Sequence, residues 1–468
     1  MKTTRGLFVF SLLAAFIGCE TVENARNVQE AVAPRAKGEA RLAPELPAFD
    51  GSLEQYVNFA LDNRPSMRQA RLEVEDARLA LKEIAANAPL ASSTPWTAFG
   101  ADASLGHSES STPAHFDKLK SNTDGNGSAS LSLDILIWDF GRNKANASAQ
   151  AERVIAAELS LVQEGYTVFE EVASTYFERL EGAALLEVAI TNERMRSEHF
   201  RLAEQRLEAG EAQKLDVLRA KLDLAESREK VVAASNNFMN CSSRFASKLG
   251  LEASNGKILP LGVEGSALEG MSHAFEETGF KSAELYSFAR TNSPSIQVSR
   301  ARLKAASYNV DYAINDLLPN LSASVSLNWS DPLWTWRWGV NAAQSLFTGF
   351  KRTTAIDRAA VALESALADL DDVELGLSVE IEVAVANRDN SKEAIATAKA
   401  SVASAKENLD TVREQLFVGD VSRVEYTEAV ADYASSLASL VEAFYAHQIS
   451  EAKLFALTGQ KPLYRKRN

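Results

Sequence analysis

The side chains best placed to act together are carboxylates that follow two glycines. Glu425 and Glu428 come six and nine residues after Gly419. They are three positions apart, so on a helix they share one face. Asp216 stands six residues after Gly210 and matches Glu425. Grouped carboxylates attract cations and repel anions. The alternative interpretation is that they are ordinary solvated side chains of an acidic chain.

Other chemistry finds little support in the sequence. The motifs HExxH, GxSxG, GxGxxG and the Walker lysine loop do not occur. The two cysteines, Cys19 and Cys241, are too few for a disulfide framework or a zinc cage. His199 and His447 fall on predicted helices without a ligand at matching spacing, and we interpret both as packing or surface residues. We therefore predict no enzyme activity, no cofactor and no metal site.

The composition indicates a folded, acidic chain. Of the 468 residues, 46% are apolar, and 49 basic side chains face 63 acidic ones, for a net charge of -14. A nucleic-acid partner is not expected, because phosphate contacts need clustered lysine and arginine.

The first 18 residues are typical of a secretory signal peptide. Lys2 and Arg5 precede the uncharged stretch Gly6–Gly18. The stretch ends in a small residue followed by Cys19, which resembles a bacterial lipobox. We predict a lipid anchor on Cys19 and a linker over residues 19–50. The alternative is an ordinary signal peptide that leaves Cys19 as an incidental thiol.

The rest of the sequence contains a duplication. The matching elements are Asn63-Arg64-Pro65 with Asn292-Ser293-Pro294, Gly141-Arg142 with the stretch from Gly349 to Arg352, Gly210 with Gly419, and Gly250 with Gly459. The offset is 208 for the Gly141 pair and 209 for the two later glycine pairs. A nearly constant offset over so long a stretch indicates two structural repeats. We predict repeat 1 over 51–254, an inter-repeat segment over 255–282, repeat 2 over 283–460 and a basic tail over 461–468.

Within each repeat the hydrophobic period changes from helix to strand and back. Short helices are predicted at Ser66–Ala88 and Ser295–Leu317, and strands at 97–105, 128–137, 321–329 and 334–341. Long helices, free of proline, follow at Asn143–Glu208 and Thr353–Phe417, with helical partners at Leu215–Leu249 and Val424–Leu457. Gly125-Asn126-Gly127 is interpreted as part of a turn. The hairpin loops are predicted at His107–Gly127 and Ser330–Leu333.

The strands have the pattern of a transmembrane β-barrel. Ala323, Val325 and Leu327 alternate with serines, so one face is apolar and the other polar. All six tryptophans lie in or beside the strand segments: Trp96, Trp138, Trp329, Trp334, Trp336 and Trp338. We predict that they form a membrane girdle, with the apolar face toward lipid. The alternative, a soluble β-sandwich, lacks enough apolar faces for a core.

The order of helix, hairpin, long helix, glycine turn and helix, present twice, resembles the TolC-like outer-membrane efflux proteins. The resemblance rests on Asn-x-Pro, on the Gly-x-Arg strand-to-helix element and on the turns at Gly210 and Gly419, and covers roughly residues 51–459. It implies a mixed, mostly α membrane protein: a homotrimer with a twelve-stranded barrel, four strands per chain, continued by a periplasmic α-helical coiled-coil tunnel. Four strands per chain leave two open edges, which three chains closing one barrel remove.

The resemblance also implies partners and site residues. The expected partners are a periplasmic adaptor and an inner-membrane transporter of RND or ABC type. The adaptor contact is placed at Glu208, Gly210, Glu211, Val418, Gly419 and Asp420. The periplasmic gate is placed at Asp216, Glu425 and Glu428. The family's locking arginine is here Val421, and Arg423 is the candidate substitute.

Two other classes of protein compete with this interpretation. A periplasmic adaptor also has a long helical hairpin, and a structural coiled-coil protein has long helices. Neither accounts for two tryptophan-rich hairpins of alternating strands. The cargo is left open between drugs, metal ions and a secreted polypeptide, although the absence of His/Met clusters in the sequence weighs against a dedicated copper or silver site.

Overall fold

The computed structural model describes most of the chain. The described residues are 23–30, 32–33, 36, 47, 49–86, 99–110, 124–210, 213–257, 259–261, 266, 268, 271, 275, 282–330, 333–345, 347–418 and 421–460. The predicted signal peptide, Cys19, Trp96 and the basic tail lie outside them. The chain divides into residues 1–48 and residues 49–468. In the first unit residues 23–30 are helical.

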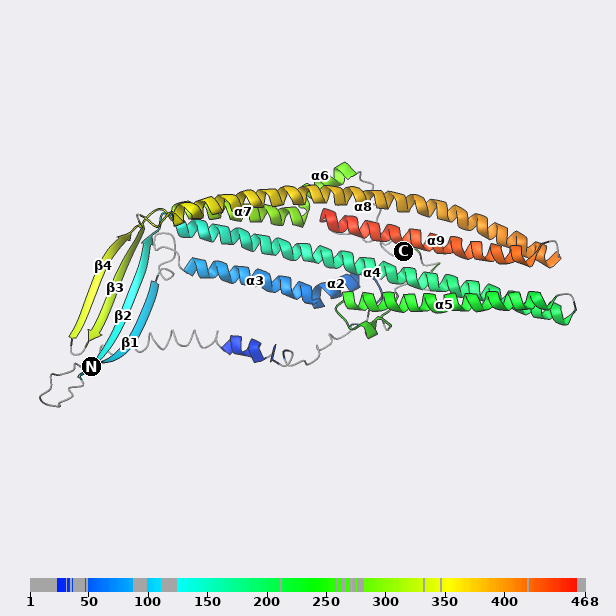
Figure 1. Ribbon diagram of the computed structural model, residues 1–468, viewed down its shortest axis with the longest axis horizontal. Helices are drawn as coiled ribbons and strands as arrows, with labels where there is room; N and C mark the ends of the chain where they lie inside the picture. Colours follow the sequence, from blue (N-terminus) through cyan, green and yellow to red (C-terminus); the bar gives the residue numbers. More distant parts are fainter. Residues whose placement is uncertain are drawn as a thin grey trace. The chain divides into compact units, whose positions relative to one another are not determined.

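The same series of elements occurs twice in the second unit (Figure 1). The first series is α2 (Leu53–Asn63), α3 (Pro65–Ala86), β1 (Phe99–Ser110), β2 (Asp124–Trp138), α4 (Arg142–Glu208) and α5 (Lys214–Lys248). The second is α6 (Ser282–Asn292), α7 (Pro294–Asn315), β3 (Asn320–Ser330), β4 (Leu333–Ala343), α8 (Lys351–Val418) and α9 (Arg423–Thr458). A short 3-10 helix, η1 (Ala253–Lys257), begins the stretch between them. The predicted bounds of the six helices are confirmed to within two residues.

The two long helices are the main supports of the fold. The helix α4 has 67 residues and α8 has 68, which corresponds to about 100 Å each. Helices of this length need partners along their sides. The helix α4 packs against α3, α5, α7 and α9, whereas α8 packs against α7 and α9 and more briefly α6. The sheet lies at one end of these helices and the α4–α5 and α8–α9 turns lie at the other (Figure 1).

Each Asn-x-Pro element joins two helices end to end. The side chains of Asn63 and Asn292 each donate to the carbonyl four residues earlier, at 3.0 Å in both repeats. The proline then occupies the first position of the next helix, where its missing N–H costs no hydrogen bond. The last helix of the repeat ends against this joint, at Gly250 in repeat 1 and at Gly459 in repeat 2. Both glycines have positive φ, +81° and +67°.

The strand-to-helix corners correct the predicted alignment of the repeats. Two consecutive residues adopt left-handed backbone in each corner: Phe140 and Gly141 in repeat 1, Gly349 and Phe350 in repeat 2. The backbone amide of Arg142 donates to the carbonyl oxygen of Asp139. In the same way, the amide of Lys351 donates to the carbonyl oxygen of Thr348. The equivalent of Gly141 is therefore Phe350, not Gly349, and the offset is 209 here as well. The glycine changed position within the pair, which the sequence match could not reveal.

The four strands form one antiparallel sheet in the order β1-β2-β3-β4. Its register confirms the predicted alternation. Leu133, Val325 and Trp338 form one cross-strand row, and Ser132, Ser326 and Arg337 form the next. Paired residues of an antiparallel sheet share a face. One face of β2, β3 and β4 is therefore apolar and the other mainly polar.

Two details of the first hairpin differ from the prediction. The strands continue to Ser110 and from Asp124, so the loop predicted at His107–Gly127 shrinks to 111–123, outside the described residues. Gly125-Asn126-Gly127 belongs to β2, although its residues are typical of turns. A bulge between Leu136 and Trp138 leaves Ile137 unpaired and pairs Trp138 with Leu321. The extra residue moves Trp138 onto the apolar face, because a one-residue shift exchanges the faces.

The largest core lies where α2, α4, α5 and α9 meet parts of the inter-repeat segment. Tyr56, Val168, Phe245 and Val441 are fully or almost fully buried there. Arg179 is only 2% exposed and donates to the carbonyl oxygens of Leu259, at 2.5 Å, and Pro260, at 3.1 Å. A buried arginine thus fastens the inter-repeat segment to α4. Cys241 is a buried free cysteine.

Candidate functional site

The candidate site lies at the turns that end the two long helices. The helix α4 ends at Glu208, and Gly210 follows with φ of +77°, a conformation that suits glycine. The helix α8 ends at Val418. Glu211, Gly419 and Asp420 lie outside the described residues. The structure therefore places Glu208, Gly210 and Val418 of the predicted adaptor contact at one end of the helices.

The first turns of α5 and α9 are capped in related ways. The carboxylate of Asp216 accepts a hydrogen bond from the amide of Gln213 at 3.1 Å, which completes a capping box. The hydroxyl of Ser422 accepts from the amide of Glu425 at 3.3 Å. Asp216 thus holds its own helix terminus in place, while Glu425 receives its cap from another residue.

Three arginines connect the α4–α5 hairpin to the α8–α9 hairpin. Arg423 on α9 approaches Asp216 on α5, with Nη1 3.2 Å from Oδ2. Arg206 on α4 donates to the carbonyl of Leu416 at 3.4 Å.

The third connection starts further from the turn. Arg196 on α4 donates to the carbonyl of Thr427 at 2.9 Å, and Asp223 on α5 lies 3.4 Å from its guanidinium. We call these three arginines, Arg196, Arg206 and Arg423, the hairpin ties.

The predicted gate residues are not all in the same state. Asp216 pairs with Arg423, so its charge is largely compensated within the chain. Glu425 and Glu428 are exposed, and among the described residues their side chains have no hydrogen bond or ion pair. The structure brings Arg423 and Asp216 together and leaves the side chains of the two glutamates exposed.

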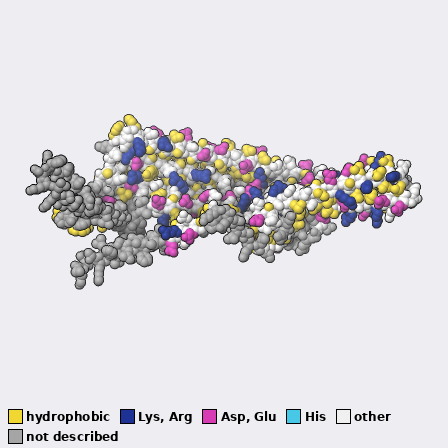
Figure 2. Space-filling model, turned by 60° about the horizontal axis from the view of Figure 1, so that its bottom comes forward, with side chains coloured by type: hydrophobic (Ala, Val, Ile, Leu, Met, Phe, Trp, Pro, Cys, Tyr) yellow, Lys and Arg dark blue, Asp and Glu magenta, His cyan; other side chains and the backbone are white. Residues whose placement is uncertain are grey.

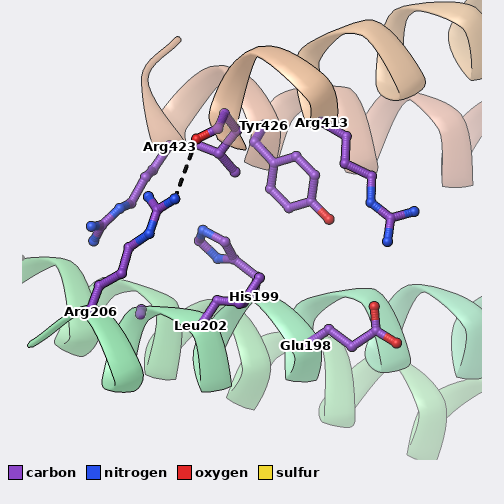
Figure 3. Close-up of a pocket in the computed structure, with 9 residues that line it drawn as sticks. Glu198, His199, Leu202, Arg206, Arg413, Arg423 and Tyr426 are labelled. Carbon is purple, nitrogen blue, oxygen red and sulfur yellow. Dashed lines mark hydrogen bonds between the residues drawn. The ribbon is translucent and has the colours of Figure 1, made fainter. Parts of the chain in front are cut away.

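A small pocket lies beside the hairpin ties (Figure 3). Its polar lining comes from α4, with Glu198, His199 and Arg206, and from the α8–α9 hairpin. His199 is 7% exposed and stacks near Tyr426, with ring centroids 5.2 Å apart. Burial lowers the pKa of His199, and the nearby guanidinium groups of Arg423, Arg196 and Arg206 lower it further, against the opposing effect of Asp223. Burial and the neighbouring guanidinium groups therefore both disfavour the protonated imidazole.

The described part of the chain contains no helix that is both long and apolar enough to cross a membrane. Within the same residues, no three His, Cys, Asp or Glu side chains are grouped so that they could hold a metal ion.

Comparison with known proteins identifies the family. The family model for the outer membrane efflux protein matches residues 57–250 and 285–460. The chain belongs to the outer membrane efflux protein family. This match decides against the adaptor and the structural coiled-coil interpretations, and its two segments fall within the two series of elements.

Relatives and solved structures agree with this assignment. The efflux protein is 20% identical to the outer membrane efflux protein BepC of Brucella suis over 71% of this chain and 72% of BepC. It is 26% identical to the pyoverdine export outer membrane protein OpmQ of Pseudomonas putida over 58% of this chain and 55% of OpmQ. The crystal structure of CusC matches with a TM-score of 0.74 and 19% identity, over 90% of this chain and all of CusC. The fold is therefore the mostly helical, TolC-like fold.

The tryptophans of this efflux protein are distributed along its sheet. Trp138 ends β2, and Trp334 pairs with Trp329 beside the short β3–β4 turn. Trp336 and Trp338 follow Trp334 along β4 and are 69% and 71% exposed. Only some of them are at strand ends, but the described tryptophan positions all belong to the apolar rows of the sheet.

The sequence left His199 and His447 open between packing and surface positions, and the structure buries both. Other residues of the site were missed by sequence reasoning. The hairpin ties Arg196 and Arg206 carried no sequence signal, because arginine is common on helix surfaces. For Arg423 the only signal was a positive charge close to a glycine turn.

Proposed function

We propose that this protein is a passive export duct of the outer membrane, which works as a homotrimer with a periplasmic adaptor and an RND or ABC transporter of the inner membrane. Membership of the outer membrane efflux protein family supports the outer-membrane location. The energy for transport comes from the transporter. OpmQ is named for pyoverdine export, and we propose a small-molecule cargo here as well.

The observation that best supports the trimer is the open four-stranded sheet. Each chain has two edge strands, β1 and β4, whose outer backbone groups need partners. In lipid an open edge is not tolerated, because each unpaired backbone group costs several kcal/mol. Three chains would supply twelve strands and close the barrel. The apolar rows with Val325 and Trp338 would then face lipid, and the rows with Ser326 would face the lumen.

The basic test has two parts. Outer-membrane fractions should contain the protein as heat-resistant trimers, and a deletion strain should become sensitive to part of a panel of toxic compounds. A soluble periplasmic monomer would refute the duct. If the deletion strain kept its resistance to every compound and accumulated a polypeptide inside the cell, secretion would replace efflux as the proposed function.

We propose that the tie between Arg423 and Asp216 takes the place of the family's lock. The resemblance puts the locking arginine at position 421, which is valine here. Arg423→Gln should raise single-channel conductance of the purified trimer, because one of the contacts that hold the hairpins together is lost. Arg219→Gln, a charge change on α5 outside the ties, is the control. Equal conductance of wild type and Arg423→Gln would refute the proposal that this ion pair is the lock.

Glu425 and Glu428 are proposed as the selective ring of the gate. In a trimer each forms three like charges around a narrow entrance. The double variant Glu425→Gln/Glu428→Gln should lower cation selectivity and block by trivalent cations. Glu414→Gln on α8 is the matched control, and unchanged selectivity in the double variant would leave both residues as solvated side chains.

The turns at Gly210 and Gly419 are proposed as the adaptor contact, and Cys19 as the lipid anchor. Charge reversal at Glu211 and Asp420 should impair export while trimers still assemble. Cys19→Ser should abolish incorporation of labelled fatty acid. Normal export in the first experiment, or labelling that persists in the second, would contradict the respective proposal.

A further inference from the structure

A second pocket lies at the end of α9, between α4, α8 and the Asn-x-Pro joint of repeat 2. Its described lining contains three carboxylates, Glu170 of α4 and Asp372 and Glu380 of α8, and no lysine or arginine. Its volume is about 340 Å³, many times the roughly 10–15 Å³ that one water molecule requires, so an extended side chain fits. We propose that this pocket binds the basic tail, residues 461–468 of the same chain, through its lysine and arginine side chains.

The three carboxylates have no cation within the pocket. Among the described residues they make no hydrogen bond and no ion pair. Burial raises the pKa of Glu170, and Glu380 and Glu171 raise it further against the opposing effect of Lys453. Because Lys453 is not part of the lining, the pocket keeps an excess of negative charge, which favours a positively charged occupant.

Repeat 1 shows how the same position is filled when the chain supplies the cations itself. Glu171 of α4 is the equivalent of Glu380, 209 residues earlier. It pairs with the guanidinium of Arg64, in the Asn-x-Pro joint, and with Lys248 at the end of α5, whose Nζ is 3.0 Å away. This place in the repeat therefore accepts both an arginine and a lysine side chain.

Repeat 2 keeps the acid but lacks both cations. Ser293 takes the place of Arg64, Leu457 takes the place of Lys248, and both replacements line the pocket. Glu380 has thus lost the two counter-ions that its equivalent has in repeat 1. The comparison is independent of the charge count, and it indicates that lysine or arginine from another segment belongs here.

The basic tail begins at the edge of this pocket. The hydroxyl of Tyr166, a lining residue, donates to the carbonyl of Gly459 at 2.7 Å. Lys461 follows two residues after Gly459, and an extended chain advances at most about 3.6 Å per residue, so its backbone stays within roughly 7 Å of that glycine. The tail contains four cationic residues: Lys461, Arg465, Lys466 and Arg467.

Other cations are poorer occupants. Within the described residues, no three His, Cys, Asp or Glu side chains are grouped so that they could hold a metal ion. A free organic amine would have to be bound from dilute solution, whereas the tail is attached beside the pocket and has a high effective concentration there. The contact would fasten the end of α9 to α4 and α8, as Lys248 fastens the end of α5 to α4. It does not depend on the proposed function.

The test is zero-length cross-linking of the purified, detergent-solubilised full-length protein with a water-soluble carbodiimide, followed by mass spectrometry. The reagent activates a carboxylate, a lysine amine in contact attacks it, and an amide forms while the carbodiimide takes up the water and leaves as a urea. We expect links within one chain from Lys461 or Lys466 to Asp372 or Glu380.

Two comparisons make the test specific. The double variant Arg465→Gln/Arg467→Gln keeps both lysines and should lower the yield of these links roughly threefold to fivefold, because two of the four cations are lost. Glu382 is the matched control carboxylate. It is exposed two residues beyond Glu380, on the opposite side of α8, and should form few links to the tail.

Absence of links from the tail to the pocket would overturn the proposal. Added glycine methyl ester then tells the reason: labelling of Asp372 and Glu380 shows an empty pocket, and protection shows another occupant. Equal linking of Glu382 and Glu380, or an unchanged yield in the double variant, would also overturn it. Links that join two chains would do so by assigning the tail to a neighbouring copy. None of these measurements involves export, so failure of the tail contact and failure of the duct are distinguished.

Discussion

The helices α4 and α8 are nearly equal in length and occupy matching positions of the two repeats, yet their surroundings differ. The helix α4 has neighbours on several sides, and its buried residues extend from Ala145 to Ala203. The helix α8 leaves much of its surface open, with Val361, Leu375 and Val379 at least 60% exposed. An exposed apolar strip on a long helix needs a cover. Repeat 1 therefore supplies most of the internal support of the chain, while α8 of repeat 2 keeps an exposed apolar surface.

The difference continues at single positions 209 residues apart. Gly182 on α4 lies close to Phe238, and a Cβ at Gly182 would be 3.4 Å from the Cα of Phe238. The equivalent residues in repeat 2 are Ser391 and His447, whose Oγ and Nδ1 are 3.2 Å apart. Close packing in repeat 1 has thus been replaced by a hydrogen bond in repeat 2.

The largest effect is expected from Arg179→Met in repeat 1. The substitution leaves the carbonyls of Leu259 and Pro260 without their guanidinium donor. Losing a donor to buried groups costs about 1–3 kcal/mol each, so we expect about 3 kcal/mol in unfolding free energy. Denaturant titration monitored by circular dichroism measures it.

Arg194→Met is the control for that variant, since Arg194 is exposed on the same helix. It should change stability by less than about 0.5 kcal/mol. If Arg179→Met and Arg194→Met were equally stable, the hydrogen bonds of Arg179 would not be what holds the inter-repeat segment to α4.

The next effect compares the two glycines that end the repeats. A Cβ at Gly459 would lie 2.9 Å from the carbonyl oxygen of Asn292, whereas at Gly250 the nearest atoms are 3.5 Å away. Both positions also have positive φ, which costs alanine roughly 1 kcal/mol. Gly459→Ala should therefore cost about 2–3 kcal/mol and Gly250→Ala about 1 kcal/mol. The Gly459→Ala variant should therefore melt at a lower temperature than Gly250→Ala. A higher melting temperature for Gly459→Ala would contradict the tighter joint in repeat 2.

The smallest effect concerns Glu181 of α4, whose equivalent in repeat 2 is Asn390. Burial, reinforced by Glu442 and Glu178, raises the pKa of Glu181 to about 7. A raised pKa in the folded state means that stability is highest below the unfolded pKa and falls as the pH rises toward 7. Partial exposure reduces the effect to roughly 1–2 kcal/mol.

The measurement is unfolding free energy at pH 5 and pH 8. Glu181→Gln should remove most of the decrease between the two, while Glu193→Gln, further along α4, should keep it. A wild type that is equally stable at both pH values would refute the pH effect.

Regular periodicity made most of the fold predictable. The helices and the apolar face of the sheet follow from periods of 3.6 and 2, and these were correct within a few residues. The errors arose where the same local sequence is compatible with two kinds of backbone structure. Gly125-Asn126-Gly127 is typical of a turn but continues β2, and the bulge at Ile137 has no sequence signature.

The candidate site was less predictable than the fold. The spacing after the glycines located Asp216, Glu425 and Glu428, but it could not tell that Asp216 pairs with Arg423. The pocket with His199 and Tyr426 joins residues more than 200 positions apart, and such contacts depend on how α4 and α9 pack. Local patterns carry no information on that packing.

Asp316 at the end of α7 is shared by both repeats. Arg142 approaches it at 3.0 Å and Arg352 at 3.3 Å. The corresponding position in repeat 1 is Asn87, which has no charge. Because one acid serves two arginines, a half-length fragment containing only repeat 1 would lack the counter-ion of Arg142, so the strand-to-helix corner of repeat 1 depends on a residue of repeat 2.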